Sequence, residues 1–204
     1  MPDAESIAIE LYLRNQVAPR FAQIVGDAAT RLEALQREVA DLRAARGSIA
    51  WEIDGPGGGT WYLNIADGAM AVDTAPIEPP VMHVVQSLAD WQRFAAGATT
   101  PGFLGGSNSG RAFGKTRIDR LKTIKGSVRF VITSLPDGGE WALVTRFGSG
   151  PFLAEPQTTV TLDAAVMRQM QSGEINPQLA FMQGQVKIAG DAGLAMQLGM
   201  ALFL

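Results

Sequence analysis

Histidine and cysteine, the residue types most often found in zinc sites and nucleophile–base pairs, are nearly missing from this chain of 204 residues. The chain has one histidine, His83, and no cysteine, so it offers neither a zinc ligand set nor a thiolate site. His83 lies in a segment typical of a strand, without a Gly-x-Ser-x-Gly nucleophile elbow nearby, which favours a structural histidine. Single carboxylates, which are usually solvated loop acids, occur in or beside turns at Glu52, Asp54, Glu140, Glu155 and Glu174. We therefore expect no catalytic residue, no metal and no cofactor.

Two glycine-rich segments invite comparison with phosphate-binding loops. Gly114-Lys115-Thr116 has the ending of such a loop, but the pattern requires a glycine five residues before Gly114, and Ser109 occupies that position. No buried strand precedes it either, so we expect residues 112–124 to form a helix with a solvated basic face. The segment 54–59 lacks both the lysine and a following helix start, and it predicts a hairpin loop. The net charge of −3 gives no electrostatic reason to expect a nucleic-acid partner.

Length and composition describe a chain that can build a sizeable core. Apolar residues make up 47% of the 204 residues, which suits one large or two small domains. The first residues, MPDAES, contain no basic n-region, and the longest apolar run falls short of the ~20 residues that a membrane-spanning helix needs. The sequence ends in LFL, which is not a peroxisomal targeting signal. We therefore expect a cytoplasmic protein.

Apolar residues in the N-terminal part follow a helical pattern. Residues 4–16 are compatible with a helix, and Pro19 is expected to break or restart it. A heptad seam follows, with alternating steps of 4 and 3 residues. Its members are Phe21, Val25, Ala28, Leu32, Leu35, Val39 and Leu42. We expect this helix to end near Arg46 and Gly47 and to pack on the protein's own sheet, and a homodimer formed through the same seam is the alternative.

The remainder of the chain shows strands followed by a helix twice. In the first half, alternating segments at 48–53 and 61–65 and an apolar segment at 80–86 precede a helix capped by Ser87. In the second half, strands between 127 and 162 precede a helix capped by Asp163. Several residues have counterparts 76 positions later: Gly97 and Gly173, Pro101 and Pro177, Gly114 and Gly190, Ile118 and Leu194.

We infer from these correspondences an internal pseudo-repeat. The chain then divides into an N-terminal helical extension at 1–46, a degenerate unit at 47–125 and a second unit at 126–204. One enlarged domain, in which the extra strands extend a single sheet, is the alternative.

The C-terminal segment from 175 to 204 is strongly apolar. Asp191 is suited to cap a helix, because its carboxylate can accept the free N–H groups of the first turn. From Leu194 onward the residues are apolar or small almost all round, so such a helix must be covered on most sides. It can be a core helix or the lid of an apolar cavity. Methionines favour a surface that adapts to what fills it, and they stand at 167, 170, 182, 196 and 200.

The order of short motifs in this part resembles the sterol carrier protein 2 family of lipid-binding domains. The motifs are Ser172-Gly173, Ile175-Asn176-Pro177, Ala180-Phe181-Met182-Gln183-Gly184, Val186-Lys187-Ile188 and Gly190-Asp191, followed by an apolar helix. The match is strongest over residues 158–203 and extends more loosely back to Gly126. The resemblance implies an α+β fold, in which an antiparallel or mixed sheet of about five strands has helices packed over one face. It also implies a tunnel between these layers that takes fatty acyl chains, acyl-CoA, sterols or phospholipids.

The first unit departs from the family pattern. Its counterpart of the C-terminal helix is basic, and Gly105-Gly106-Ser107 replaces the motif at 182–184. We therefore expect the first unit to lack the lid, and the resemblance does not extend lipid binding to it.

These features predict a protein that binds, carries or presents a hydrophobic ligand in an apolar cavity under the C-terminal helix. The expected apolar contacts are Met167, Met170, Ile175, Phe181, Met182, Leu194, Met196, Leu198 and Met200. Gln183 and Gln197 are expected to orient a polar head group. An enzyme that folds a polyketide or polyene chain in the same cavity is one alternative, and an interaction scaffold without a ligand is another. The expected partners are a hydrophobic small molecule and at most a transient membrane contact.

Overall fold

The structure is a computed structural model that describes residues 4–97, 113–148 and 154–203. The predicted glycine-rich segment at 101–110, Arg111 of the predicted basic cluster and the predicted loop at Phe152 lie outside these residues. The chain divides into two compact units, Met1–Ala40 and Asp41–Leu204, and each is described by itself. Within the described part, no helix is long and apolar enough to cross a membrane.

The N-terminal part is helical. α1 (Ala4–Tyr12) continues through a π-helical turn, η1 (Leu13–Val17), into α2 (Ala18–Arg43). Of the expectation that Pro19 breaks or restarts the helix, the break is wrong, and α2 begins at Ala18 after the π-helical turn. Because proline lacks an N–H and crowds the preceding turn, the helix widens locally, and the Ala18 N–H donates to the Leu13 carbonyl.

The heptad seam of α2 is exposed to solvent. None of the residues of α2 is fully buried; Leu42, at the end of the seam, is half-buried, and the five other large apolar seam side chains are 45% to 70% exposed. They are Phe21, Val25, Leu32, Leu35 and Val39. The helix ends at Arg43, and Gly47 is the first residue of a strand rather than a helix cap.

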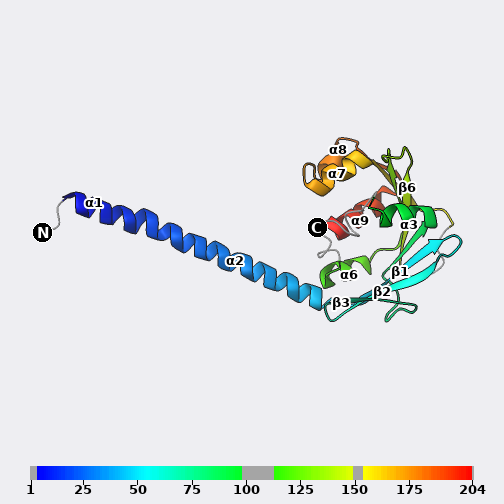
Figure 1. Cartoon of the computed structure of the whole chain (residues 1–204), viewed down its shortest axis with the longest axis horizontal. Coiled ribbons are helices and arrows are strands. Elements are labelled where there is room, and N and C mark those ends of the chain that lie inside the picture. Colours follow the sequence, from blue (N-terminus) through cyan, green and yellow to red (C-terminus); the bar gives the residue numbers. More distant parts are fainter. Residues whose placement is uncertain (1–3, 98–112, 149–153, 204) are drawn as a thin grey trace. The chain divides into compact units, whose positions relative to one another are not determined.

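Within the described residues, eight strands form one mixed sheet in the order β3-β2-β1-β4-β6-β5-β7-β8. Figure 1 shows β1, β2 and β3 side by side at one end of it. They are β1 (Gly47–Asp54), β2 (Gly59–Ala66), β3 (Ala69–Asp73), β4 (Met82–Ser87), β5 (Gly126–Thr133), β6 (Trp141–Phe147), β7 (Thr158–Asp163) and β8 (Val186–Gly190). The pairs β1–β4 and β5–β7 are parallel, and the other pairs are antiparallel. The sheet has more strands than the resemblance implied, because β4 of the first half pairs with β6 of the second.

The two halves share a pairing pattern. In the first half, β1 pairs with β2 in antiparallel fashion and with β4 in parallel fashion. In the second half, β5 pairs in the same way with β6 and with β7. β4 and β7 each precede a helix. The single sheet also agrees with the alternative of one enlarged domain, so the pseudo-repeat and its boundaries stay a prediction.

The helices cover one face of this sheet. They are α3 (Leu88–Ala95), α6 (Lys115–Leu121), α7 (Ala164–Ser172), α8 (Pro177–Met182) and α9 (Ala192–Phe203). Strand residues alternate between faces, and the covered face carries the large apolar side chains. The opposite face carries polar and charged residues, including Glu52, His83, Arg129 and Lys187. The expected α+β fold, with a mixed sheet, covering helices and an N-terminal helical extension, is confirmed.

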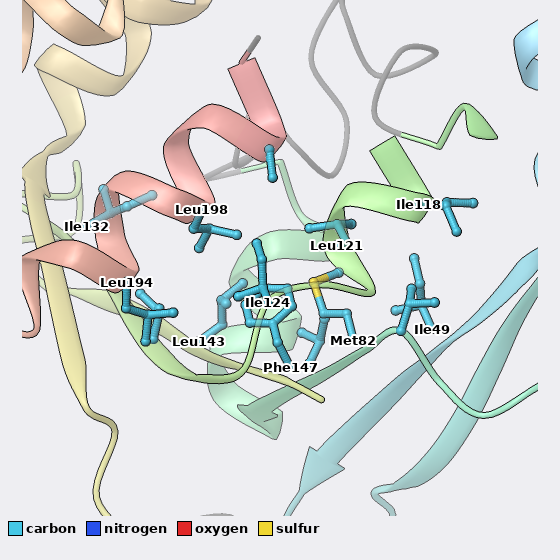
Figure 2. Packing of buried hydrophobic residues seen from close by; sticks show 14 of the residues in the cluster. Ile49, Met82, Ile118, Leu121, Ile124, Ile132, Leu143, Phe147, Leu194 and Leu198 are labelled. Carbon is cyan, nitrogen blue, oxygen red and sulfur yellow. The ribbon is translucent and has the colours of Figure 1, made fainter. Parts of the chain in front are cut away.

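The core lies between the sheet and helices α6 and α9. Figure 2 shows Leu194 and Leu198 of α9 beside Leu121 of α6, over Leu143 and other strand residues. The predicted caps place these helices: the side chains of Ser87, Asp163 and Asp191 each accept a backbone N–H from the first turn of α3, α7 and α9. α9 is therefore held in the core along the side that carries Leu194, Leu198 and Ala201.

The loop between β1 and β2 is the predicted hairpin loop. Ile53 of β1 pairs with Gly59 of β2 in antiparallel register. A Cβ at Gly58 would lie 2.0 Å from the carbonyl oxygen of Ile53, and one at Gly59 would lie 3.4 Å from the Trp61 ring. Gly58 therefore has no room for any side chain, which accounts for the glycine cluster without a phosphate.

We expect Leu198→Ala to lower the free energy of unfolding by about 2–5 kcal/mol, because Leu198 is 3% exposed and its loss leaves a cavity. Met196→Ala is the matched control on the same helix, 60% exposed, and should cost less than about 1 kcal/mol. Urea denaturation followed by circular dichroism measures both. Equal losses for the two variants would mean that α9 does not pack in this orientation.

Candidate functional site

The C-terminal helices present a group of large apolar side chains to solvent. We call it the C-terminal apolar surface, and its members are Leu179, Phe181 and Met182 of α8 and Met196 and Met200 of α9. Met182 is 81% exposed. Both helices pack on β8, which places them in the same region of the covered face. Large exposed apolar groups of this kind commonly mark a binding surface rather than a structural feature.

Local sequence explains why these side chains point outward. The Asn176 side chain accepts the Leu179 N–H, and Pro177 occupies the first turn, so α8 begins at a fixed point. Ala180 is then the residue of α8 that turns inward, where it packs with Val166 and Ile175. In α9, the inward side follows the spacing of 194, 198 and 201, which leaves positions 196 and 200 on the other side.

The structure separates the predicted ligand contacts into three groups. Leu194 and Leu198 belong to the main core, and Ile175 belongs to the smaller cluster. Met167 and Met170 are half-buried against the core. The remaining predicted contacts are exposed, namely Phe181, Met182, Gln183, Met196, Gln197 and Met200. Whether these residues contact a ligand stays a prediction.

A pocket of about 410 Å³ lies in the first half of the sheet, where sequence reasoning did not expect a site. It is lined by Trp51, Ile53, Gly57, Trp61, Leu63, Leu88, Trp91 and Phe94, and we call it the aromatic pocket. The strands β1 and β2 supply its floor, and α3 covers it. Its signal in the sequence is the clustering of three of the four tryptophans within one strand pair and the following helix.

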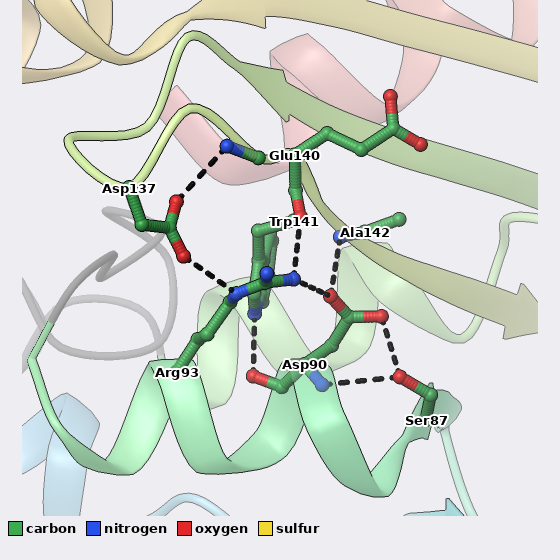
Figure 3. A network of polar contacts seen from close by, with 8 residues as sticks. Ser87, Asp90, Arg93, Asp137, Glu140, Trp141 and Ala142 are labelled. Atoms are coloured by element: carbon green, nitrogen blue, oxygen red, sulfur yellow. Dashed lines mark hydrogen bonds and ion pairs between the residues drawn. The ribbon is translucent and has the colours of Figure 1, made fainter.

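A network of polar contacts anchors α3 above the sheet (Figure 3). The Trp141 indole N–H donates to the Asp90 carbonyl at 2.9 Å, and the Asp90 carboxylate accepts the Ser87 hydroxyl at 2.7 Å. Arg93 donates to the Glu140 carbonyl at 2.9 Å and to the Asp137 carboxylate at 3.3 Å. These contacts tie α3 to β6 and to the loop before it, so the helix can lie over the pocket without filling it.

Electrostatic effects in this network centre on Asp137. The backbone N–H of Gly139 donates to its carboxylate, and the Arg93 guanidinium lies beside it. Both favour the charged form, and together they hold the pKa of Asp137 below its ordinary value.

The residues considered for chemistry have other roles in the structure. His83 lies half-buried on the polar face of the sheet, and burial, followed by the nearby Arg146 charge, lowers its pKa. Gly114 caps α6 through its backbone, and Lys115 forms an ion pair with Asp119. The Thr116 hydroxyl donates to the Asp41 carboxylate at 2.7 Å. The near-match to a nucleotide-binding loop is therefore a helix start whose polar groups bind carboxylates.

The fold and these surfaces define a two-layer α+β protein with helices over one face of a mixed sheet. Residues 111–203 match the profile of the SCP-2 sterol transfer family. The sterol carrier protein 2 of Rattus norvegicus is 36% identical over 84 residues, which cover 38% of this chain and 15% of the rat protein. The peroxisomal multifunctional enzyme A of Dictyostelium discoideum is 28% identical over 148 residues, which cover 66% of this chain and 31% of that enzyme.

Among solved structures, the sterol carrier protein domain 2 of Helicoverpa armigera is 30% identical, with a TM-score of 0.32, over 40% of this chain and 69% of that one. The chain spans 15% of the length of the rat relative, so it corresponds to one part of that longer protein. Residues 111–203 therefore form an SCP-2-like domain.

We expect the anchor of α3 to weaken in acid. The folded-state pKa of Asp137 is lowered, so its contribution to stability is present above the unfolded pKa of about 3.9 and is lost as pH falls through the folded value. Asp137→Asn should therefore lose less stability than the unmodified protein between neutral pH and about pH 3. Urea denaturation at the two pH values gives this difference.

Glu140→Gln is the control, because it neutralises a neighbouring acid whose side chain takes no part in the drawn network. If Asp137→Asn loses as much stability in acid as the unmodified protein does, Asp137 does not anchor α3.

Proposed function

We propose that this protein binds a hydrophobic ligand of the lipid or sterol class at the C-terminal apolar surface, and that it carries or presents that ligand. The observation that supports this most directly is the set of large apolar side chains exposed on α8 and α9, within the segment that matches the SCP-2 sterol transfer family. The name of the rat relative, sterol carrier protein 2, agrees with the proposed class of ligand.

The two sides of α9 have different roles in this proposal. Leu194 and Leu198 hold the helix on the core, and Met196 and Met200 are free to contact an acyl chain or a ring system. Burial of apolar ligand surface contributes about 0.8 kcal/mol for each CH₂ group, and methionine adapts to irregular shapes. Such a site binds by total apolar area and distinguishes poorly between chains of similar length. Gln183 and Gln197, both exposed, would orient the polar head group.

The residues present favour a protein that carries its ligand over an enzyme that converts it. The helices α8 and α9, PQLAFM and AGLAMQLGMALF, contain no titratable side chain. General acid–base and nucleophilic catalysis both require such a group within reach of the reacting atoms. The enzyme alternative therefore has no residue on these helices to support it.

The ligand site can be tested with a displaceable fluorescent fatty acid. We expect Met182→Gln combined with Met196→Gln to weaken its binding by at least about tenfold, because two apolar contacts are lost. Both side chains are exposed, so urea denaturation should show unchanged stability. Met70→Gln, on β3 and also exposed, is the matched control and should bind as the unmodified protein does.

Two results would contradict this proposal. Unchanged affinity in the double variant would place the fatty acid elsewhere. A protein that binds no displaceable fatty acid and yields no lipid on extraction would favour the interaction scaffold.

We further propose that α2 pairs in parallel with α2 of a second copy. In the heptad register, Val25, Leu32 and Val39 occupy a positions, and the d positions hold leucine at 35 and 42 and Phe21 and Ala28 nearer the start. β-Branched residues at a with leucine at d favour parallel two-stranded coils. The same register places Glu38 at g and Arg43 at the following e position, where opposite charges meet across a parallel pair. A second copy would cover the seam that the single chain leaves exposed.

Adjacent substitutions test this pairing. Leu35→Glu puts a charge in the seam and should convert a dimer to a monomer, because an unpaired buried charge is costly. Ala34→Glu, at an outward c position, should leave the dimer intact. Light scattering coupled to size-exclusion chromatography measures the mass of each variant. An unmodified protein that is monomeric at every concentration tested would contradict the pairing.

A further inference from the structure

The aromatic pocket combines a size and a lining that are typical of small-molecule sites. Its volume of about 410 Å³ lies within the roughly 300–1,000 Å³ range of ligand pockets. It lies entirely outside residues 111–203, so the family match does not account for it. Three indole rings and one phenyl ring line it together with aliphatic side chains.

Strand register builds the floor of the pocket. Trp51 of β1 and Trp61 of β2 are directly paired across the antiparallel ladder, on the face that the helices cover. The Trp51 and Phe94 rings lie 5.7 Å apart at 44°, which joins the floor to α3. Trp91 also comes from α3, which the polar network anchors. Strand pairing therefore positions the floor of the pocket, and the polar contacts of α3 position its cover.

Buried polar groups beside the pocket lack partners. The Trp51 indole N–H and both polar atoms of the Gln86 amide are buried without a hydrogen-bond partner among the described residues. Gln86 is 3% exposed, and it is the register partner of Ile53, which lines the pocket. Buried donors and acceptors are normally satisfied, but these atoms have almost no accessible surface and Gln86 is not among the lining residues, so a ligand in the pocket does not reach them.

The lining also restricts the charge of the ligand. None of the residues that line the pocket is charged. The pocket therefore offers no counter-ion to a carboxylate or an ammonium group, which favours a neutral ligand. Indole rings stack well on flat rings and give a large contact area without flexibility.

We propose that the aromatic pocket is a second ligand site, which takes a flat, neutral, ring-containing molecule. It is independent of the site proposed at the C-terminal apolar surface. The two differ in chemistry, because the first is lined by rigid aromatic rings and the second by exposed methionines on α8 and α9.

The test uses 6-propionyl-2-(dimethylamino)naphthalene, a flat neutral ketone whose fluorescence reports burial. We expect binding with energy transfer from tryptophan, and we expect Trp61→Leu and Trp91→Leu each to weaken it by about tenfold. Both tryptophans are partly exposed, so these variants should remain folded, which urea denaturation checks. Leu63→Trp, which fills the pocket, should block the probe in a folded protein.

Two controls separate this site from the C-terminal one. Met182→Gln combined with Met196→Gln should leave binding of the naphthalene ketone unchanged, and palmitate should not displace the ketone. The proposal is overturned if the ketone does not bind, if the three pocket variants bind it normally, or if the methionine variant or palmitate removes it. Fatty acid binding by the unmodified protein bears only on the C-terminal site.

Discussion

The pairing of β4 with both β1 and β6 is the constraint on which the rest of the fold depends. Val84 is opposite Trp51 on one side and Thr145 on the other, so a single strand sets the register of both halves. This register brings their apolar residues to the same face, where one layer of helices can cover them. It also determines where α3 begins, because Ser87 at the end of β4 caps that helix.

The helices cover the sheet unevenly, and this unevenness produces both apolar features. α6 and α9 pack closely against each other, and α9 packs on β5, β7 and β8, where the core residues are almost fully buried. α3 is held by polar contacts at its β6 side, which leaves the space over Trp51 and Trp61 unfilled. Unfilled space lined by large rings sacrifices dispersion contacts that a close-packed interior would make. Packing is therefore poorer at this pocket than in the core.

Features that depend on residues close in sequence could be predicted, whereas features that depend on contacts between distant segments could not. The caps at Ser87, Asp163 and Asp191 and the hairpin at 54–59 follow from residues close in sequence, and the structure confirms them. The β4–β6 pairing could not be predicted, because alternation identifies strands but not their neighbours. In α9, an almost wholly apolar sequence carries no periodic signal of which side is buried. The aromatic pocket depends on the Trp51–Trp61 register and the path of α3, and neither follows from composition.

The two apolar features also differ in what they can select. Methionine side chains rearrange at low cost, so a surface built from Met182, Met196 and Met200 can follow the shape of many chains. Trp51 and Trp61 sit on paired strands, and rings held in this way cannot follow a flexible chain. They favour a molecule that is already flat, since little conformational freedom is then lost on binding. The aromatic pocket is therefore rigid because its tryptophans lie on paired strands. The C-terminal apolar surface is adaptable because its methionines lie on exposed helix faces.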